Sequence, residues 1–223
     1  MSVLNNKYYI NRIKERIILL IINRSDVVSL DMFDTLVYRK CGSPDNIFKM
    51  LSTYVRTEFG IEEFNIIRTH AEKKARSTAS GGEVTLDEIY QIMSLDENIA
   101  NSIKNKELQI EIDNIVQKKS GEFIYNAAIK LGKTVVVTTD MYLPSNVISQ
   151  MLINCGYTKH SKLFVSSEIG YRKRNGGLFK YIQKTIGNEQ RIVHIGDSFI
   201  SDFVMALING IDYAVLIKRN DYE

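Results

Sequence analysis

The chain has 223 residues, of which 44% are hydrophobic and 25% are charged, with 13 glycines and only 2 prolines. This is the composition of a globular protein with one large or two small domains, and it excludes disordered, collagen-like and low-complexity chains. The 29 basic and 26 acidic residues leave a formal net charge of +3, which gives no support for a protein that binds nucleic acid.

Cysteine content and hydropathy favour a cytoplasmic protein. Cys41 and Cys155 are too few for a disulfide scaffold, and they lack the spacing of a zinc site. The apolar run at residues 17–22 is far shorter than the ~20 residues that a membrane-spanning helix needs. Charged residues interrupt the first segment before a signal-peptide core forms. We therefore expect a cytoplasmic protein without a membrane span.

Residues 5–24 carry the apolar periodicity of an amphipathic helix. The residues that recur at helical spacing are Ile10, Ile13, Ile17, Leu20 and Ile21. We expect this apolar face to dock on the protein core. Because basic residues flank it, a helix that lies on a membrane surface is the alternative.

Short apolar segments predict the strands of a buried sheet. The first is 27–30, and the others, which follow after a long gap, are 134–138, 162–165, 191–195 and 213–217. The helical patterns that separate the later strands lie at 145–154, 177–186 and 199–208. This alternation predicts an α/β fold, with a Rossmann-like parallel sheet that helices cover on both faces.

The gap between the first two strands contains no convincing strand and predicts several helices. The expected helices are 44–59, 62–77, 86–93, which opens on the capping-box residues Thr85 and Glu88, and 96–119, as one long or two short helices. A βαβ connection needs only about a dozen residues. We therefore expect an inserted all-helical subdomain at residues 41–120 and an α/β core at residues 1–40 and 121–223.

Polar side chains follow the predicted strands at their carboxyl ends, which meet at one edge of a parallel sheet. They are Asp31 and Asp34 after the first strand, Thr139 and Asp140 after the second, Lys173 beyond the third, and Asp197 and Asp202 after the fourth. Carboxylates brought together repel one another unless a cation joins them, and Mg²⁺ prefers such oxygen ligands. A hydroxyl and an ammonium beside them suit a phosphoryl group. The sequence therefore indicates a magnesium and phosphate site.

These segments resemble the four motifs of the haloacid dehalogenase (HAD) superfamily, which consists mostly of Mg²⁺-dependent phosphatases. Residues 27–36 are similar to the first motif and residues 135–139 to the second. Lys173 matches the lysine of the third motif, with Arg174 as the alternative, and Asp197 and Asp202 match the acids of the fourth. The helical insertion sits where this family carries a C1-type cap. Residues 31–36 and 140–144 further resemble a subgroup that often accompanies glycosyltransferases in bacterial surface-glycan assembly.

The resemblance implies hydrolysis of a small phosphate monoester through an aspartyl-phosphate on Asp31. Mg²⁺ would be held by Asp31, Asp197 and the backbone carbonyl of Phe33, with Asp202 in support through water. The residues expected to bind substrate are Thr139, Asp140, Lys173 and Arg39, and further candidates to line the pocket are Tyr142, Tyr171 and Arg172. The subgroup suggests a phosphorylated sugar or amino-alcohol precursor of a surface polysaccharide as the substrate.

The sequence departs from this family at one position. Most of its phosphatases carry a second Asp two residues after the nucleophile, where this chain has Phe33, and an acid follows one residue later at Asp34. Side chains alternate along an extended segment, so Asp34 reaches the pocket only if the segment is coiled there. Asp34 is therefore either the general acid/base or a residue that caps a turn.

Two other functions stay open at this point. An apolar or aromatic residue at the position of Phe33 also occurs in the metal-independent dehalogenases of the family. A non-catalytic domain that binds a phosphorylated ligand or a partner is the third interpretation. Asp197 and Asp202 favour the Mg²⁺-dependent phosphatase, because a dehalogenase has no reason to gather acids near Asp31 without a cation.

Overall fold

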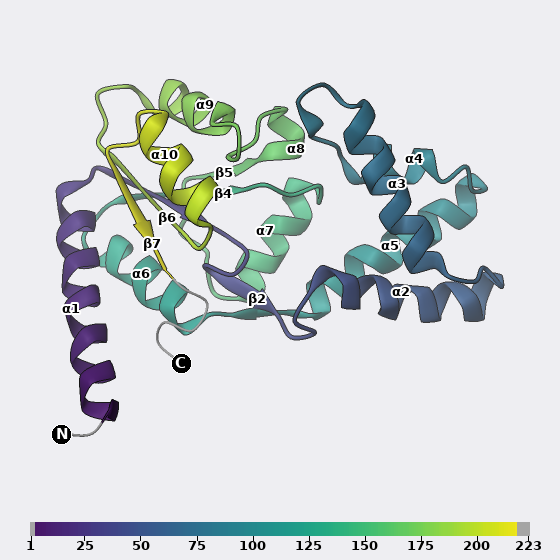
Figure 1. The fold of residues 1–223 in the computed structure, drawn as a ribbon, viewed down its shortest axis with the longest axis horizontal. Coiled ribbons are helices and arrows are strands. Elements are labelled where there is room, and N and C mark those ends of the chain that lie inside the picture. Colours follow the sequence, from purple (N-terminus) through teal and green to yellow (C-terminus); the bar gives the residue numbers. More distant parts are fainter. Residues whose placement is uncertain (1–2, 218–223) are drawn as a thin grey trace.

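The computed structural model describes the backbone of residues 3–217, and the side chains of residues 12–217 except that of Ser80. Its centre is a five-stranded parallel sheet in the order β5-β4-β1-β6-β7 (Figure 1). The strands are β1 (Val27–Asp31), β4 (Thr134–Thr139), β5 (Lys162–Val165), β6 (Ile192–Gly196) and β7 (Tyr213–Leu216). The predicted parallel α/β sheet is confirmed, and each strand lies within one residue of its expected ends.

Helices cover both faces of this sheet because its strands are apolar on both sides. One core contains Val28 and Val135, and it includes residues of α6 and α7. The other core contains Val27 and Val136, which are adjacent to Val28 and Val135 in the same strands and therefore point to the opposite face, and it includes residues of α9 and α10. The covering helices are α1 (Val3–Arg24), α6 (Lys119–Lys130), α7 (Ser145–Asn154), α8 (Ser166–Ile169), α9 (Gly177–Ile186) and α10 (Met205–Ile208).

The helix predicted at 199–208 is one segment with two geometries. It begins as a wide π-helical turn, η2 (Phe199–Val204), and continues as α10. The Ser198 hydroxyl accepts a hydrogen bond from the backbone N–H of Ser201 and caps the start of this segment. Such π-helical turns often occur at functional sites, and Asp202 lies within this one.

The first helix forms where the sequence predicts it, but the expectation for its apolar face was wrong. Ile18 and Ile22 are the buried residues, whereas Ile13, Ile17 and Leu20 are 58%, 50% and 59% exposed. Residues 17–22 are apolar all round the helix, so periodicity alone did not show which side packs on the core. The side chain of Ile10 lies outside the described residues. Between residues 3 and 217, no helix is long and apolar enough to cross a membrane.

Four helices and a short 3₁₀ turn lie between residues 44 and 113 and form a helical insertion at one end of the molecule (Figure 1). They are α2 (Pro44–Phe59), α3 (Phe64–Thr78), η1 (Ser80–Gly82), α4 (Leu86–Ile92) and α5 (Glu97–Asp113). The predicted capping box is present. The Thr85 hydroxyl accepts a hydrogen bond from the backbone N–H of Glu88, and the Glu88 carboxylate accepts one from the backbone N–H of Thr85.

The expectation of no strand in this region was wrong. A two-stranded antiparallel ribbon, β2 (Val37–Arg39) and β3 (Ile115–Gln117), joins the insertion to the core at both of its ends. Each strand has three residues, too few for an alternating pattern to be recognised. The helix expected over 96–119 therefore ends at Asp113, and α6 begins at Lys119.

The insertion is also fastened to the core by a buried arginine. Arg68 on α3 donates to both carboxylate oxygens of Glu107 at 2.9 Å, and the Tyr90 hydroxyl donates to the same carboxylate at 2.8 Å. The Arg68 guanidinium lies 4.7 Å from the centre of the Phe48 ring and 4.8 Å from that of Tyr142, which belongs to the core loop after β4. Every charge in this cluster is paired, as burial requires.

Replacing Gly121 by Ala tests how closely α6 packs against the loop that follows β1. A Cβ at this position would lie 2.5 Å from the Thr35 carbonyl oxygen and 2.6 Å from the Leu36 Cα. We expect Gly121→Ala to lower the free energy of unfolding by about 2 kcal/mol or more, measured in urea. The control Asn126→Ala, at an exposed position of the same helix, should cost nothing. Equal stability of both variants would contradict this packing.

Candidate active site

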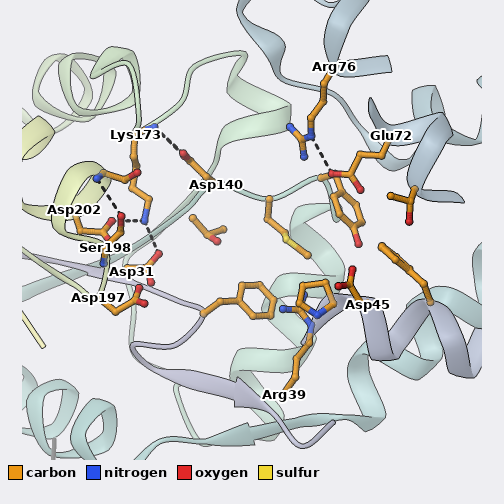
Figure 2. A pocket seen from close by; sticks show the side chains of 18 of the residues that line it. Asp31, Arg39, Asp45, Glu72, Arg76, Asp140, Lys173, Asp197, Ser198 and Asp202 are labelled. Atoms are coloured by element: carbon orange, nitrogen blue, oxygen red, sulfur yellow. Dashed lines mark hydrogen bonds and ion pairs between the residues drawn. The ribbon is translucent and has the colours of Figure 1, made fainter. Parts of the chain in front are cut away.

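A cavity of about 540 Å³ lies at the carboxyl ends of the strands, between the sheet and the helical insertion (Figure 2). One wall carries Asp31, Thr139, Asp140, Lys173, Asp197 and Asp202, which follow the strands of the sheet. The opposite wall comes from the insertion and the ribbon, and it carries Arg39, Asp45, Phe48, Thr69, Glu72, Lys73 and Arg76. Because β1, β4 and β6 are neighbours in the sheet, their carboxyl ends deliver residues from distant parts of the chain to one place.

Lys173 is the cation at the centre of the strand-end wall. Its ammonium donates to Asp31 Oδ1 at 2.5 Å and to Asp202 Oδ1 at 2.6 Å, and the residue is only 4% exposed (Figure 2). Burial opposes the charge of the Lys173 ammonium, but the carboxylates of Asp31 and Asp202 outweigh it and raise the pKa of Lys173 well above its usual range. Lys173 is therefore charged and fixed in place. Arg174, the alternative to it, is exposed.

Asp140 holds the loop that carries Lys173. Its two carboxylate oxygens accept hydrogen bonds from the backbone N–H of Lys173 at 2.9 and 3.1 Å (Figure 2). Thr139, the last residue of β4, is 2% exposed and lines the cavity beside it. Asp140 thus contributes to the wall, and its carboxylate positions the main chain of the lysine.

Asp202 is held by partners on three sides. Oδ1 accepts from Lys173 Nζ and lies 3.1 Å from His194 Nε2, while Oδ2 accepts from the backbone N–H of Ser198 at 2.9 Å. Although burial opposes ionisation, the Lys173 charge and the His194 hydrogen bond hold the pKa of Asp202 well below its usual range. Gly196 makes room for this carboxylate, because a Cβ there would lie 2.3 Å from Asp202 Cγ.

His194 continues a buried hydrogen-bond chain behind the site. Burial lowers the pKa of His194 despite the adjacent Asp202 carboxylate, so the ring is neutral at pH 7. Because a carboxylate only accepts, Nε2 carries the proton and donates to Asp202. Nδ1 then accepts from the Ser29 hydroxyl at 2.9 Å, and Ser29 accepts from the Thr138 hydroxyl at 2.9 Å. The chain crosses β6, β1 and β4 and fixes the orientation of Asp202.

Asp31, Asp197 and Asp202 form a cluster that fits a divalent cation. One oxygen from each of the three carboxylates lies within 4.8 Å of the others. Burial, with the charges of Asp202 and Asp197, raises the pKa of Asp31 to about 7 in spite of Lys173. Burial and the charges of Asp202 and Asp34 also raise the pKa of Asp197. The single ammonium does not balance these acids, and Mg²⁺ suits an all-oxygen donor set of this kind.

Phe33 and Arg39 form the floor of the cavity next to Asp31. Phe33 lines the cavity, and the Arg39 guanidinium lies 4.3 Å from the centre of its ring. Arg39 also donates to both carboxylate oxygens of Glu111, at 2.8 and 3.0 Å. The charge of Arg39 is therefore already paired within the protein.

Asp34 does not belong to the wall formed by the other predicted residues. Its backbone is left-handed, with φ of 59°, and its N–H donates to the Val37 carbonyl in the turn after β1. The segment is thus coiled, which is the condition under which Asp34 turns toward the site. The charge of Asp34 contributes to raising the pKa of Asp197. The acid/base role of Asp34 stays a prediction.

Among the other candidates for the pocket lining, Tyr142 lies in the cavity wall. Tyr171 is half exposed, and Arg172 pairs with Glu83 of the insertion at 2.8 Å; neither is among the cavity-lining residues. Sequence reasoning missed Ser29 and His194, although a polar residue inside an otherwise apolar strand was a usable signal. It also missed the insertion residues of the opposite wall, for which the sequence offers no comparable sign.

Removing the Asp31 carboxylate should stabilise the metal-free protein. In Asp31→Asn the buried repulsion with Asp197 and Asp202 is relieved, while Lys173 keeps Asp202 as its partner. We expect the free energy of unfolding in the presence of a chelator to rise by about 1 kcal/mol or more. Asp45→Asn, at an exposed position of the opposite wall, is the control and should change little. A lower free energy of unfolding for Asp31→Asn would show that repulsion from Asp197 and Asp202 does not destabilise the protein at Asp31.

No protein-family model and no curated protein matches the sequence. Solved structures match the fold. One is a HAD phosphatase from Thermococcus onnurineus, with a TM-score of 0.60, 16% identity and 87% of each chain covered. Another is a 2-haloacid dehalogenase from Pseudomonas syringae pv. Tomato DC3000, with a TM-score of 0.63, 12% identity and 86% of each chain covered.

A third similar structure is the HAD-hydrolase YfnB from Bacillus subtilis bound to magnesium, with a TM-score of 0.58 and 14% identity over 86% of this chain and 88% of that chain. At such low identities the likeness concerns the fold, and one fold supports several chemistries. The chain therefore has the α/β fold of the HAD-superfamily hydrolases.

Proposed function

We propose that the protein is a cytoplasmic Mg²⁺-dependent phosphatase that hydrolyses a small phosphate monoester, with Asp31 as the nucleophile. The observation that carries this proposal is the constellation at the ends of β1, β4 and β6. There a buried carboxylate is paired with a lysine, and two further acids stand within the reach of one cation. A neutral substrate needs no such arrangement, whereas a phosphoryl group and its metal do.

The cation would be held by Asp31, Asp197 and the backbone carbonyl of Phe33. Asp202 is engaged by Lys173, His194 and Ser198, which suits a supporting role through water. When bound, Mg²⁺ supplies positive charge that neutralises Asp31 and the phosphoryl oxygens. Lys173, in the same wall, would add positive charge, and the hydroxyl of Thr139 would donate a hydrogen bond to a phosphoryl oxygen.

The reaction divides into two displacements at phosphorus. In the first, an Asp31 oxygen forms a bond to phosphorus while the bond from phosphorus to the leaving oxygen breaks. The leaving oxygen takes a proton, from Asp34 or from water, and departs as an alcohol. In the second, the oxygen of a water molecule forms a bond to phosphorus while the bond from Asp31 to phosphorus breaks. The attacking water gives a proton to Asp34 or to bulk water, and the step releases inorganic phosphate and restores the Asp31 carboxylate.

The helical insertion would act as a cap over this chemistry, with its edges near residues 41 and 120. Glu83 supports this role, because it accepts from the Ser166 hydroxyl at 2.6 Å and pairs with Arg172, next to Lys173. Contacts of the insertion thus reach the lysine loop directly. A cap closed over the cavity excludes water and selects the leaving group.

The cavity suits a small polar leaving group. Its far wall carries Asp45, Lys73 and the ion-paired Glu72 and Arg76. Figure 2 shows Asp45, Glu72 and Arg76 on the side of the cavity opposite Asp31 and Lys173. Carboxylates and cations in one wall bind hydroxyl and amino groups. A phosphorylated sugar or amino alcohol is consistent with this wall, and the sequence subgroup suggests a precursor of a bacterial surface polysaccharide.

A metal-independent dehalogenase is the second candidate. The observation that favours it is Phe33, which lines the cavity where the phosphatases carry an acid. In this reaction Asp31 would attack carbon and displace a halide. The cluster of Asp31, Asp197 and Asp202 favours the phosphatase, because these acids repel one another without a cation.

Asp31→Asn should abolish phosphate release while the protein stays folded, because an amide is a far poorer nucleophile than a carboxylate of the same shape. The measurement is release of inorganic phosphate from a panel of sugar and amino-alcohol phosphates, with Mg²⁺ and with a chelator. Asp113→Asn, at an exposed position, is the control for the loss of one acid. Turnover above about a hundredth of the starting rate would place the nucleophile elsewhere, and chelator-resistant release of halide from a 2-haloacid would support the dehalogenase.

Asp34→Asn should slow alkyl phosphates far more than p-nitrophenyl phosphate if Asp34 protonates the leaving group, by about 100-fold or more for the alkyl ester. An aryl oxide leaves without a proton, so the aryl ester depends on the acid only in the later hydrolysis. Phe33→Asp is the complementary variant, because it restores the spacing of most phosphatases in the family. The ratio of kcat/KM for alkyl over aryl esters is the readout. An unchanged ratio in Asp34→Asn would end the case for Asp34.

A further inference from the structure

The first helix presents an apolar stripe that the rest of the described protein does not cover. This stripe, here called the α1 apolar face, consists of Ile13, Ile17 and Leu20, which are 58%, 50% and 59% exposed. Their spacing of four and three residues places them in one row along α1. The buried residues Ile18 and Ile22 lie on the opposite side of the same helix. The helix therefore has two apolar faces, one packed on the core and one exposed.

Basic residues flank the α1 apolar face. At helical spacing Arg12 and Arg16 lie along one side of it and Lys14 along the other, and Arg24 ends the helix. The one acid in residues 12–24, Glu15, lies on the far side from the stripe. The face is thus bordered by positive charge, and its covering partner must tolerate or prefer this charge.

The apolar surface continues from α1 onto α6. A groove of about 810 Å³ between the two helices is lined by Leu20 of the stripe, by Phe123 of α6 and by Leu131, which directly follows α6. Its basic lining residues are Arg16, Lys119 and Lys130, against a single acid, Glu122. The combination of apolar side chains and net positive charge thus extends over two elements rather than one isolated helix.

We propose that the α1 apolar face and this groove dock the protein on the surface of an anionic lipid bilayer. A basic amphipathic helix inserts its aliphatic side chains at the boundary between headgroups and acyl chains, while its Lys and Arg side chains contact lipid phosphates and carboxylates. A second copy of the chain fits this surface less well, because pairing two α1 helices would bring their basic rows together.

Docking at this face leaves the active-site cavity accessible. In Figure 1, α1 and the helical insertion lie at opposite ends of the long axis of the molecule. A bilayer in contact with α1 would therefore not cover the cavity between the sheet and the insertion. The attachment is peripheral, and turnover of a water-soluble substrate should not depend on it.

Co-sedimentation with vesicles tests this proposal. We expect the full chain to sediment with vesicles of phosphatidylcholine and phosphatidylserine at low salt, weakly with phosphatidylcholine alone, and less at high salt. The variant Ile13→Gln/Ile17→Gln/Leu20→Gln should lose about tenfold or more in partitioning, and Arg16→Gln/Lys130→Gln should lose binding to the anionic vesicles selectively. Circular dichroism checks that the fold of each variant is intact.

A matched control separates this face from general surface hydrophobicity. Ile153 on α7 is 52% exposed, close to the 50% of Ile17, so Ile153→Gln should bind vesicles like the wild type while Ile17→Gln binds less. Equal binding of these two variants, no sedimentation of the wild type, or equal binding to neutral and anionic vesicles would each overturn the proposal. So would a wild-type dimer that Ile17→Gln converts to a monomer, since the face would then be covered by a second copy.

Discussion

The arrangement of the candidate active site depends on one ammonium group placed between two buried carboxylates. Lys173 bridges Asp31 and Asp202 at 2.5 and 2.6 Å in a wall that is almost closed to water. An unpaired ammonium at this depth would cost several kcal/mol, so Lys173 needs at least one of these carboxylates beside it. With Asp197 the acids still outnumber the cation, and this excess of negative charge is what a divalent metal would neutralise.

Hydrogen bonds from neighbouring core residues hold these charged groups in position. Asp140 holds the backbone of Lys173, and the chain from Thr138 through Ser29 and His194 holds Asp202. The bonds that join Thr138, Ser29 and His194 run between neighbouring strands, so Asp202 is held in place before any ligand binds. The cost is a cluster of acids whose mutual repulsion weakens the fold, which is a common compromise between activity and stability.

Much of the sheet could be predicted from the sequence because its strands are short, continuous apolar runs that end in polar residues. For this reason the sequence predicted that Asp31, Thr139, Asp140 and Asp197 lie close together, since strand ends of a parallel sheet meet at one edge, and all four line the cavity. The ribbon of β2 and β3 could not be found, because three-residue strands separated by the whole insertion are stabilised by their pairing and not by their pattern. The far wall of the cavity was equally hidden, since it depends on how α2 and α3 fold over the sheet.

The first helix shows a different limit of sequence reasoning. Its periodic stripe at Ile13, Ile17 and Leu20 was the expected buried face, yet the structure buries Ile18 and Ile22. An apolar pattern indicates that a helix face needs to be covered. It does not indicate whether the protein core or an external partner covers that face. The proposed partner of α1 is therefore inferred separately from the chemistry of the active-site cavity, which is inferred from the charges around Lys173.

The most direct test of the central claim is to trap the covalent intermediate. Protein quenched with acid during turnover of a phosphate ester with Mg²⁺ would be treated with borohydride, which reduces an acyl phosphate to an alcohol, and then digested for peptide mass spectrometry. Our account predicts homoserine at position 31, dependent on both substrate and Mg²⁺. Reduction at another carboxylate, or turnover with no reduced residue at all, would contradict it.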